Sequence, residues 1–377
     1  MKKIILIPDS FKGTMTSIQI CTILKRAIQT ILPDVSTISI PVGDGGEGTA
    51  EAFRLAAGGQ RYIETVCGPH FEPVEAAYTI LPDGTAVIEM AAAAGIPLCK
   101  GPLDPMTATT YGVGQLIDSA LEQGCTRIIL GLGGSATNDG GCGAACALGA
   151  QFFDSQGKLF IPSGGTLGRI ATLDLTELQK KLDGAAITCM CDIDNPLFGP
   201  NGAAAVFAPQ KGATEEQIQI LDDGLHHLSE KLLTCTNRDV ANLPGAGAAG
   251  GMGGGCAALF HAELKSGIET VLNTVGFDAL ASGADLVITG EGKIDGQSAR
   301  GKVISGVSQR TQALKIPCIA IVGDAGNGYE SLYGKGLTAV FSINRTAIPF
   351  EQARLRAGDD LYRTACDLLR LIRECTA

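Results

Sequence analysis

The sequence contains no tryptophan and only four histidines among its 377 residues, and it has no long apolar run. No stretch reaches the roughly 20 consecutive apolar residues that a membrane-spanning helix needs, which argues against a helical membrane protein. The first apolar segment, residues 4–7, meets Pro8 and is too short for a signal peptide. We therefore expect a cytoplasmic protein with no membrane partner.

Positive charge is also scarce, because 29 Lys and Arg stand against 39 Asp and Glu, for a net charge of −10. No basic block occurs anywhere, so nucleic acid and anionic lipid are not expected as partners. An anionic small-molecule substrate would need a locally positive pocket. The sequence leaves open whether the chain forms a homo-oligomer.

Cysteine pairs of the kind that bind metals are missing. None of the 13 cysteines forms the Cys-x2-Cys spacing typical of structural zinc and iron–sulfur sites. The close sets are Cys142 with Cys146 and Cys189 with Cys191, and the few histidines offer them no matching partners. Most of the cysteines are therefore expected to be reduced thiols that pack as small apolar residues.

Glycine, by contrast, is abundant, with 51 residues, and 45% of the chain is hydrophobic. This composition is typical of a well-packed α/β enzyme with tight loops between buried strands. The length exceeds that of one ordinary core, so two domains are expected.

The apolar pattern predicts alternating strands and helices at both ends of the chain. A buried strand at residues 3–7 precedes a helix, and Thr16 and Gln19 have the spacing of a capping box at its start. Between residues 61 and 90 the pattern changes to strands joined by short turns, which indicates a meander. The expected fold is α/β, with a Rossmann-like doubly wound parallel sheet from residues 1–60 and 281–377 and a second, inserted α/β domain of mixed sheet at residues 61–280.

A glycine-rich run at residues 131–141 follows the apolar segment 128–130, which predicts a strand that ends in a phosphate-binding loop. Glycines let consecutive backbone N–H groups point at an anion, and hydroxyl and amide side chains add donors. Asp139 is a residue type that holds magnesium. The residues predicted to bind the nucleotide are Gly133, Gly134, Ser135, Thr137, Asn138, Gly140 and Gly141.

Polar side chains follow the first two predicted strands. Asp9 is suited to accept a proton or hold a metal, and Lys12 to meet a carboxylate or phosphate. Capping does not explain these residues, because Thr16 already caps the helix that follows. In the glycine run at residues 43–49, Asp44 is a candidate metal or substrate ligand, whereas a place near a helix N-terminus explains Glu47 adequately.

Two carboxylates, Asp192 and Asp194, follow a predicted strand at residues 185–191. Such a pair can supply a general base and a magnesium ligand. A turn before Pro196 would explain Asp194 but does not require Asp192. The predicted catalytic residues are Asp192 as the base, Asp9 and Lys12, and magnesium is predicted on Asp139 or Asp192.

A charged segment at residues 290–302 follows another predicted strand. Glu291 and Asp295 are suited to bind metal or hydroxyl groups, and Lys293 and Arg300 are cations for an anionic substrate. Surface ion pairing is an alternative explanation of the lysines. The residues predicted to bind the substrate are Ser10, Asp44, Glu291, Lys293, Asp295 and Arg300.

The most glycine-rich segment, residues 245–255, has three open interpretations: a flexible lid, a second nucleotide-contacting loop, or close backbone packing. It lacks the context of a Rossmann dinucleotide fingerprint, and the chain has no Walker sequence G-x-x-x-x-G-K-[ST]. Phosphate and magnesium must therefore be handled by a different loop design.

Seven motifs, in order from residue 4 to the C-terminus, resemble the bacterial type I glycerate kinases. The motifs are PDSFK at 8–12, DGGEGT at 44–49, MTATTYG at 106–112, LGGSATNDGG at 132–141, CDIDNPL at 191–197, PQKGA at 209–213 and GEGKID at 290–295. Gly43 stands where the resemblance leads us to expect alanine. This difference affects the flexibility of the loop and leaves the chemistry unchanged. The resemblance implies phosphorylation of D-glycerate by ATP with Mg²⁺, usually at the 2-hydroxyl to give 2-phosphoglycerate, and a Rossmann-like domain with an inserted α/β domain.

The residues alone leave other functions open. Transfer to the 3-hydroxyl, or to another small hydroxy acid, would need only a small shift of the bound substrate. A nicotinamide-dependent dehydrogenase is disfavoured by the missing fingerprint. A non-catalytic, two-lobed ligand-binding protein is disfavoured because several carboxylates at strand ends are difficult to explain without metal chemistry.

Overall fold

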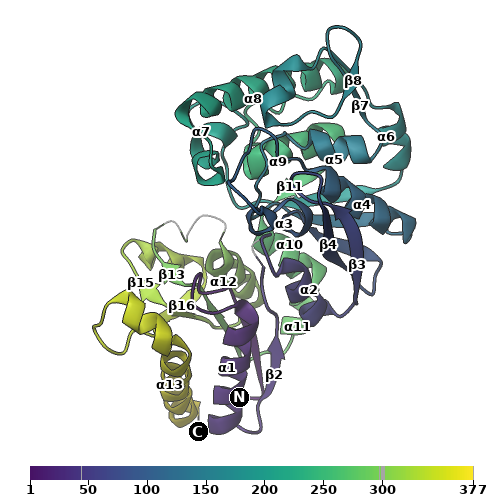
Figure 1. Cartoon of the computed structure of the whole chain (residues 1–377). Helices are drawn as coiled ribbons and strands as arrows, with labels where there is room; N and C mark the ends of the chain where they lie inside the picture. The colour runs from purple at the N-terminus through teal and green to yellow at the C-terminus, as the bar shows by residue number, and fades with distance from the viewer. Residues whose placement is uncertain (44, 297, 299–301, 377) are drawn as a thin grey trace. The chain divides into compact units, whose positions relative to one another are not determined.

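The computed structural model of the chain describes residues 1–43, 45–296, 298 and 302–376 (Figure 1). Within these ranges, no helix combines the length and the apolar character that a membrane span requires. Contacts between residues divide the chain into two compact units. Unit 1 comprises Met1–Gly43, Glu51–Ala57 and Ser266–Ala377, and unit 2 comprises Asp44–Ala50 and Gly58–Lys265.

Unit 1 is built around a sheet in which neighbouring strands are parallel. The central strands are near-continuous apolar runs, as expected for parallel strands that are covered on both faces. In spatial order the strands are β16 (Leu337–Ser342), β14 (Cys318–Val322), β12 (Leu286–Gly290), β1 (Lys3–Pro8) and β2 (Ser36–Ser39).

The order in which the chain adds strands to this sheet reverses between β1 and β12. β2 follows β1 on one side, whereas β14 and β16 extend the sheet from β12 on the other. Pro8 of β1 pairs with Gly290 of β12, so the two strands end side by side. Open α/β sheets bind ligands outside the carboxyl ends of the strands at such a point. The residues after Pro8 and Gly290 are therefore candidates for a ligand-binding site.

Helices cover this sheet. α1 (Ser17–Ile31) and α13 (Phe350–Thr376) lie side by side and share one buried core with strand residues such as Leu6 and Ile288 (Figure 1). The predicted capping box of α1 is confirmed, because Gln19 N donates to Thr16 Oγ1 at 3.2 Å and Thr16 N donates to Gln19 Oε1 at 2.8 Å. The remaining elements are α10 (Gly267–Thr274), α11 (Phe277–Ala281), α12 (Val303–Leu314), β13 (Lys293–Ile294) and β15 (Asp324–Ala325).

Unit 2 contains a mixed sheet. Its first strands, β3 (Gln60–Cys67), β4 (Pro73–Ile80) and β5 (Thr85–Glu89), pair antiparallel in sequence order, which confirms the predicted meander. The next strands are parallel, and Glu89, Gly131 and Met190 lie in register at the carboxyl ends of β5, β6 and β10. In spatial order the strands are β11 (Glu263–Lys265), β10 (Ala186–Met190), β6 (Arg127–Gly131), β5 (Thr85–Glu89), β4 (Pro73–Ile80) and β3 (Gln60–Cys67).

The other elements of unit 2 form one large buried core with this sheet. Its helices are α3 (Ala91–Ala94), α4 (Tyr111–Glu122), α5 (Cys142–Ala147), α6 (Thr176–Lys181), α7 (Ala203–Phe207), α8 (Glu215–Thr236) and α9 (Ala248–Leu259). A small antiparallel sheet contains β8 (Leu159–Phe160), β7 (Gln151–Phe153) and β9 (Thr172–Asp174). α2 (Thr49–Ala57) begins in the range of unit 2 and continues into that of unit 1.

The glycine-rich segment at residues 245–255 includes the first eight residues of α9, which is kinked at residues 249–251, and all of the segment except Ala249 is buried. A Cβ atom on Gly255 would lie 1.9 Å from the carbonyl oxygen of Gly140, and one on Gly250 would lie 2.0 Å from that of Thr137. Real Cβ atoms do not approach backbone atoms so closely, so only glycine fits there. Of the three interpretations, the structure favours close backbone packing.

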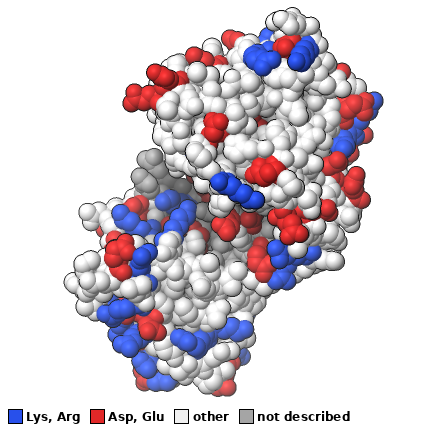
Figure 2. Space-filling model, in the orientation of Figure 1, with Lys and Arg blue, Asp and Glu red and all other residues white. Residues whose placement is uncertain are grey.

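The predicted fold class is confirmed: an α/β chain with a doubly wound parallel sheet and a second α/β unit with a mixed sheet. Unit 1 also takes in α10 and α11, because Ile268 of α10 packs on Gly306 of α12. The domain boundaries near residues 60 and 280 stay a prediction. Acidic and basic side chains are interspersed over the face seen in Figure 2, and no large patch of one sign covers it.

Candidate active site

In unit 1, two acidic residues follow the paired ends of β1 and β12. Asp9 comes after Pro8, Glu291 comes after Gly290, and Asp9 N donates to the Gly290 carbonyl oxygen at 2.8 Å. The Asp9 carboxylate accepts a hydrogen bond of 2.6 Å from Ser10 N. The structure therefore brings the predicted residues Asp9, Ser10 and Glu291 together at the switch point of the sheet.

Glu291 is only 5% exposed, and its carboxylate lies against the start of α12. Oε1 accepts from Ile304 N at 3.1 Å, and Oε2 accepts from Ser298 Oγ at 3.3 Å. Burial, with a smaller contribution from the charge of Asp9, raises the pKa of Glu291 to about 7, although the Ile304 N–H and Lys302 oppose the shift. Glu291 can therefore change its charge near neutral pH.

This pKa makes stability depend on pH. The folded protein holds the Glu291 proton up to about pH 7, whereas an unfolded glutamate releases it near pH 4.5, so stability must fall as pH rises through this window. Glu291→Gln has no such proton, and we expect it to gain stability relative to the parent between pH 5 and pH 8, with an upper limit of roughly 3 kcal/mol. Urea unfolding of both proteins at the two pH values measures the gain, and a constant difference would contradict it.

The other predicted residues of unit 1 are more exposed. Lys12 is exposed, and Lys293 Nζ lies 3.7 Å from Asp295 Oδ2. An exposed pair of this kind contributes little stability, so it leaves Lys293 available for an anion. Two further predicted residues, Asp44 and Arg300, lie outside the described residues.

In unit 2, the two glycine-rich loops pack against each other through their backbones. Gly133 N donates to the Gly45 carbonyl oxygen at 2.9 Å, and a Cβ on Gly131 would lie 2.4 Å from that same oxygen. A Cβ on Gly133 would lie 2.7 Å from Gly46 Cα. The glycines at these positions are therefore required by the close approach of one loop to the other.

Part of the predicted loop faces the protein and not a ligand. Gly140 N donates to the Gly250 carbonyl oxygen at 3.1 Å, and Gly141 N donates to Asp139 Oδ1 at 3.1 Å. These N–H groups already have acceptors within the chain, so we do not assign them to phosphate. Gly133 and Gly134 are the accessible part of the loop, although Gly133 N already donates to the Gly45 carbonyl oxygen. Gly134 is exposed and has a φ of 76°, which favours glycine.

Asp139 is completely buried and its carboxylate is fully engaged. Oδ2 accepts from Thr110 N at 2.8 Å, Thr110 Oγ1 at 2.9 Å and Gly143 N at 3.2 Å, in addition to the bond from Gly141 to Oδ1. The carboxylate thereby satisfies N–H groups at the starts of α4 and α5, although burial raises the pKa of Asp139. These contacts favour a structural role, and we do not carry Asp139 forward as a magnesium ligand.

Asp192 and Asp194 are exposed and follow the buried end of β10, Met190. Met190 is in register with Gly131, so this acidic segment and the 131–141 loop begin at the same edge of the sheet. Of the two carboxylates predicted to hold magnesium, Asp192 is the accessible one. Among the described residues, no group of three or more His, Cys, Asp or Glu side chains is arranged so that it could hold a metal ion, so any magnesium would depend on ligands from ATP and water as well.

Two buried charged residues escaped the sequence analysis. The carboxylate of Glu89, the last residue of β5, accepts hydrogen bonds from Ala50 N at 2.6 Å and Gly48 N at 3.2 Å, and so caps the start of α2. Lys211 lies in a short 3₁₀ turn (Pro209–Lys211), and its ammonium group contacts the 131–141 loop. Lys211 belongs to the PQKGA motif, and that motif was the sequence feature that could have indicated its importance. No local sequence pattern indicates the capping role of Glu89.

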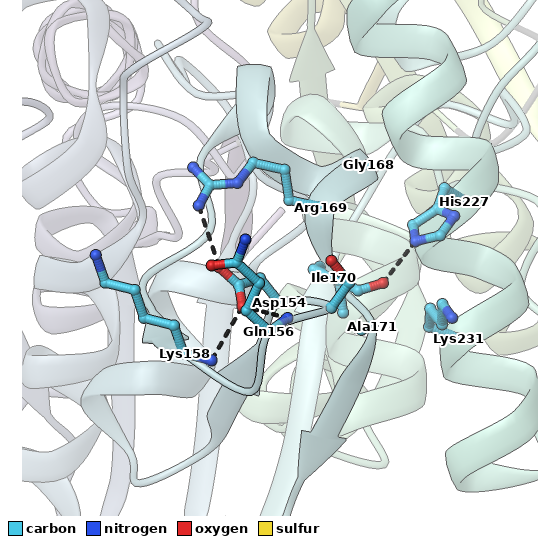
Figure 3. A pocket seen from close by; sticks show the side chains of 10 residues that line it. Asp154, Gln156, Lys158, Gly168, Arg169, Ile170, Ala171, His227 and Lys231 are labelled. Carbon is cyan, nitrogen blue, oxygen red and sulfur yellow. Dashed lines mark hydrogen bonds and ion pairs between the residues drawn. The ribbon is translucent and has the colours of Figure 1, made fainter.

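A hollow of about 660 Å³ lies elsewhere in unit 2, beside β7 and α8 (Figure 3). Asp154, Lys158, Arg169 and His227 line it, and Arg169 pairs with Asp154 at 3.5 Å. His227 Nε2 makes a 2.7 Å hydrogen bond to the Ile170 carbonyl oxygen. None of the predicted site residues lines this hollow, so we do not take it as the active site.

The chain is similar to known proteins in sequence and in fold. The model of the Glycerate kinase family matches residues 4–373. Glycerate kinase of Bacillus subtilis (strain 168) is 42% identical over 98% of both chains, and glycerate 2-kinase of Escherichia coli (strain K12) is 42% identical over 96% of both. A crystal structure assigned to glycerate kinase 2 of Salmonella typhimurium LT2 is 40% identical, with a TM-score of 0.87 over 100% of this chain and 99% of that one.

Proposed function

Because the chain belongs to the glycerate kinase family, we propose that it transfers a phosphoryl group from ATP to the 2-hydroxyl of D-glycerate and releases 2-phosphoglycerate. The observation that carries the proposal is the near full-length similarity to Escherichia coli glycerate 2-kinase. The exposed turn at Gly133 and Gly134, beside exposed carboxylates at a sheet edge, is chemically suited to phosphoryl transfer.

The nucleotide would bind unit 2 at the accessible part of the 131–141 loop. Gly133 and Gly134 have no side chain, so phosphate oxygens can approach the backbone closely there. Ser135 was predicted to contact the nucleotide, but it is buried, so its hydroxyl group would support the turn from within. Thr137 and Asn138 are completely buried, so they support this surface from behind. Asp192 fits a magnesium ion as a single accessible carboxylate, and the ion would neutralise charge on the phosphates.

Glycerate is an anion, and most of the residues proposed to recognise it belong to the range of unit 1. Lys12, Lys293 and Arg300 supply positive charge for its carboxylate, while Asp9 and Glu291 can accept hydrogen bonds from its hydroxyl groups. Asp192 is the candidate base for the attacking hydroxyl group. Ser10, Asp44 and Asp295 stay in the proposed substrate set.

Phosphorus NMR of the product tests the proposal directly. Purified protein is incubated with D-glycerate and Mg-ATP, and reactions without enzyme or with L-glycerate are the controls. We expect the proton coupling of a phosphate on C2, which differs from that of a phosphate on C3. A 3-phosphoglycerate signal would keep the kinase and overturn the regiochemistry, and the absence of any phosphorylated product would overturn the substrate.

A further inference from the structure

The Lys211 side chain is unusual because it is long, charged and only 2% exposed. Nζ donates to Ser135 Oγ at 2.8 Å and to the Thr137 carbonyl oxygen at 2.6 Å. Burying an ammonium group is unfavourable unless it is hydrogen-bonded, and here both acceptors belong to the same loop. Burial accordingly lowers the pKa of Lys211 to about 7, although the charge of Asp139 opposes the shift.

The segment that carries Lys211 is itself fixed in place. Pro209 begins the 3₁₀ turn, and Gly212 ends it with a φ of 90°. A Cβ on Gly212 would lie 2.4 Å from the Leu103 carbonyl oxygen, so no other residue fits without a shift. The ammonium group is thus held by a rigid turn and not by a mobile surface loop.

The contacted part of the loop has few other side-chain anchors. Thr137 Oγ1 and both polar side-chain atoms of Asn138 are buried without a hydrogen-bond partner among the described residues. The far end of the loop is held separately, through Asp139 to α4 and α5 and through Gly140 to α9. Backbone hydrogen bonds also hold this stretch, from Ile96 N to the Gly134 carbonyl oxygen at 3.0 Å and from Ala136 N to the Ala94 carbonyl oxygen at 2.9 Å. Lys211 adds a side-chain anchor at Ser135 and Thr137, directly behind the exposed Gly134.

We propose that Lys211 is a positioning residue of the kinase reaction, which joins Ser135 to the Thr137 carbonyl group and so holds the Gly133 and Gly134 turn in the shape that binds the phosphates of ATP. This inference rests on the proposed function, because it assigns the turn to the nucleotide. Lys211 itself is too buried to touch glycerate in the described structure.

Lys211→Met tests the role, because it keeps an unbranched side chain, one atom shorter, and removes every donor. The loss of two charge-assisted hydrogen bonds behind the turn should raise both KM for ATP and the Kd of a non-hydrolysable ATP analogue about tenfold. KM for D-glycerate should stay within about twofold of the parent value, because unit 1 is unchanged. The matched control is Lys180→Met, the same change at an exposed lysine that pairs with Glu177, and it should alter neither constant.

A merely structural role would give a different result. Lys211→Met would then lower the melting temperature, but the folded protein would bind the analogue with the parent's Kd, and that result would overturn the proposal. If the methionine variant does not fold, Lys211→Gln keeps an amide donor and should show a smaller rise in the same Kd, and an unchanged Kd would again overturn the proposal.

Failure of the proposed function is distinguishable: the parent would bind the analogue, with Lys211→Met weakening that binding, but would not phosphorylate D-glycerate. A parent that does not bind the analogue overturns both proposals.

Discussion

Asp192→Asn is expected to fold like the parent protein and to lower kcat for glycerate phosphorylation by ~10²- to 10⁴-fold, as expected for removal of a general base. The substitution keeps the size of the side chain and removes its ability to take the proton of the attacking hydroxyl group. Asp192 is exposed, so the fold does not depend on its burial. Steady-state kinetics at saturating ATP and D-glycerate, together with the melting temperature, measure both parts of the prediction.

The matched control is Asp194→Asn. It makes the same chemical change two residues along, at another exposed carboxylate of the same segment. We expect its kcat to stay within about threefold of the parent, because its carboxylate is explained by the turn before Pro196. Near-normal turnover of Asp192→Asn would eliminate Asp192 as the base, and equal losses in both variants would indicate a general electrostatic effect of the acidic segment.

The same variant separates a base from a magnesium ligand. If Asp192 acts as the base alone, the magnesium concentration that gives half-maximal activity should be the same for Asp192→Asn and the parent. A ligand would instead shift this concentration upwards, and excess magnesium would recover part of the activity. The titration therefore decides between two roles that the exposed carboxylate fits equally well.

The architecture of this chain was predictable because its signals are local. Buried parallel strands such as β1 are short continuous apolar runs, and the start of α1 follows from Thr16 and Gln19, which are three residues apart. The residues that follow strand ends were also accessible to this reasoning. Asp9 and Glu291 were each placed after a predicted strand, and pairing of Pro8 with Gly290 brings them together.

The parts that were not predicted depend on contacts between distant segments. Glu89 caps α2, which begins 40 residues earlier in the chain, and Lys211 contacts Ser135 from a separate turn. Asp139 is a residue type that commonly binds metal ions, but tertiary packing buries its carboxylate among N–H donors. Local sequence shows which side chains can donate or accept hydrogen bonds. It does not show which of them already have hydrogen-bond partners within the folded chain.

Gly255→Ala shows how strongly this packing constrains the loop, because it is expected to lower the free energy of unfolding by about 3 kcal/mol, at the upper end for overpacking. The added Cβ would lie 1.9 Å from the Gly140 carbonyl oxygen and 3.5 Å from Gly141 Cα. The first contact is with backbone, which cannot rotate away, so α9 and the 131–141 loop must separate. The φ of Gly255 lies outside the left-handed region, so the whole effect is steric.

Gly254→Ala is the control in the same helix. There the nearest atoms to the new Cβ are the side-chain atoms Leu197 Cδ1 at 3.2 Å and Ala246 Cβ at 3.4 Å. A small shift can relieve these contacts, and alanine gains about 1 kcal/mol of helix propensity over glycine, so we expect a change within about 1 kcal/mol. Urea unfolding of the two variants should therefore separate them clearly. If Gly255→Ala were as stable as Gly254→Ala, α9 would not approach Gly140 closely enough to require glycine, and the shape of the loop would not depend on this contact.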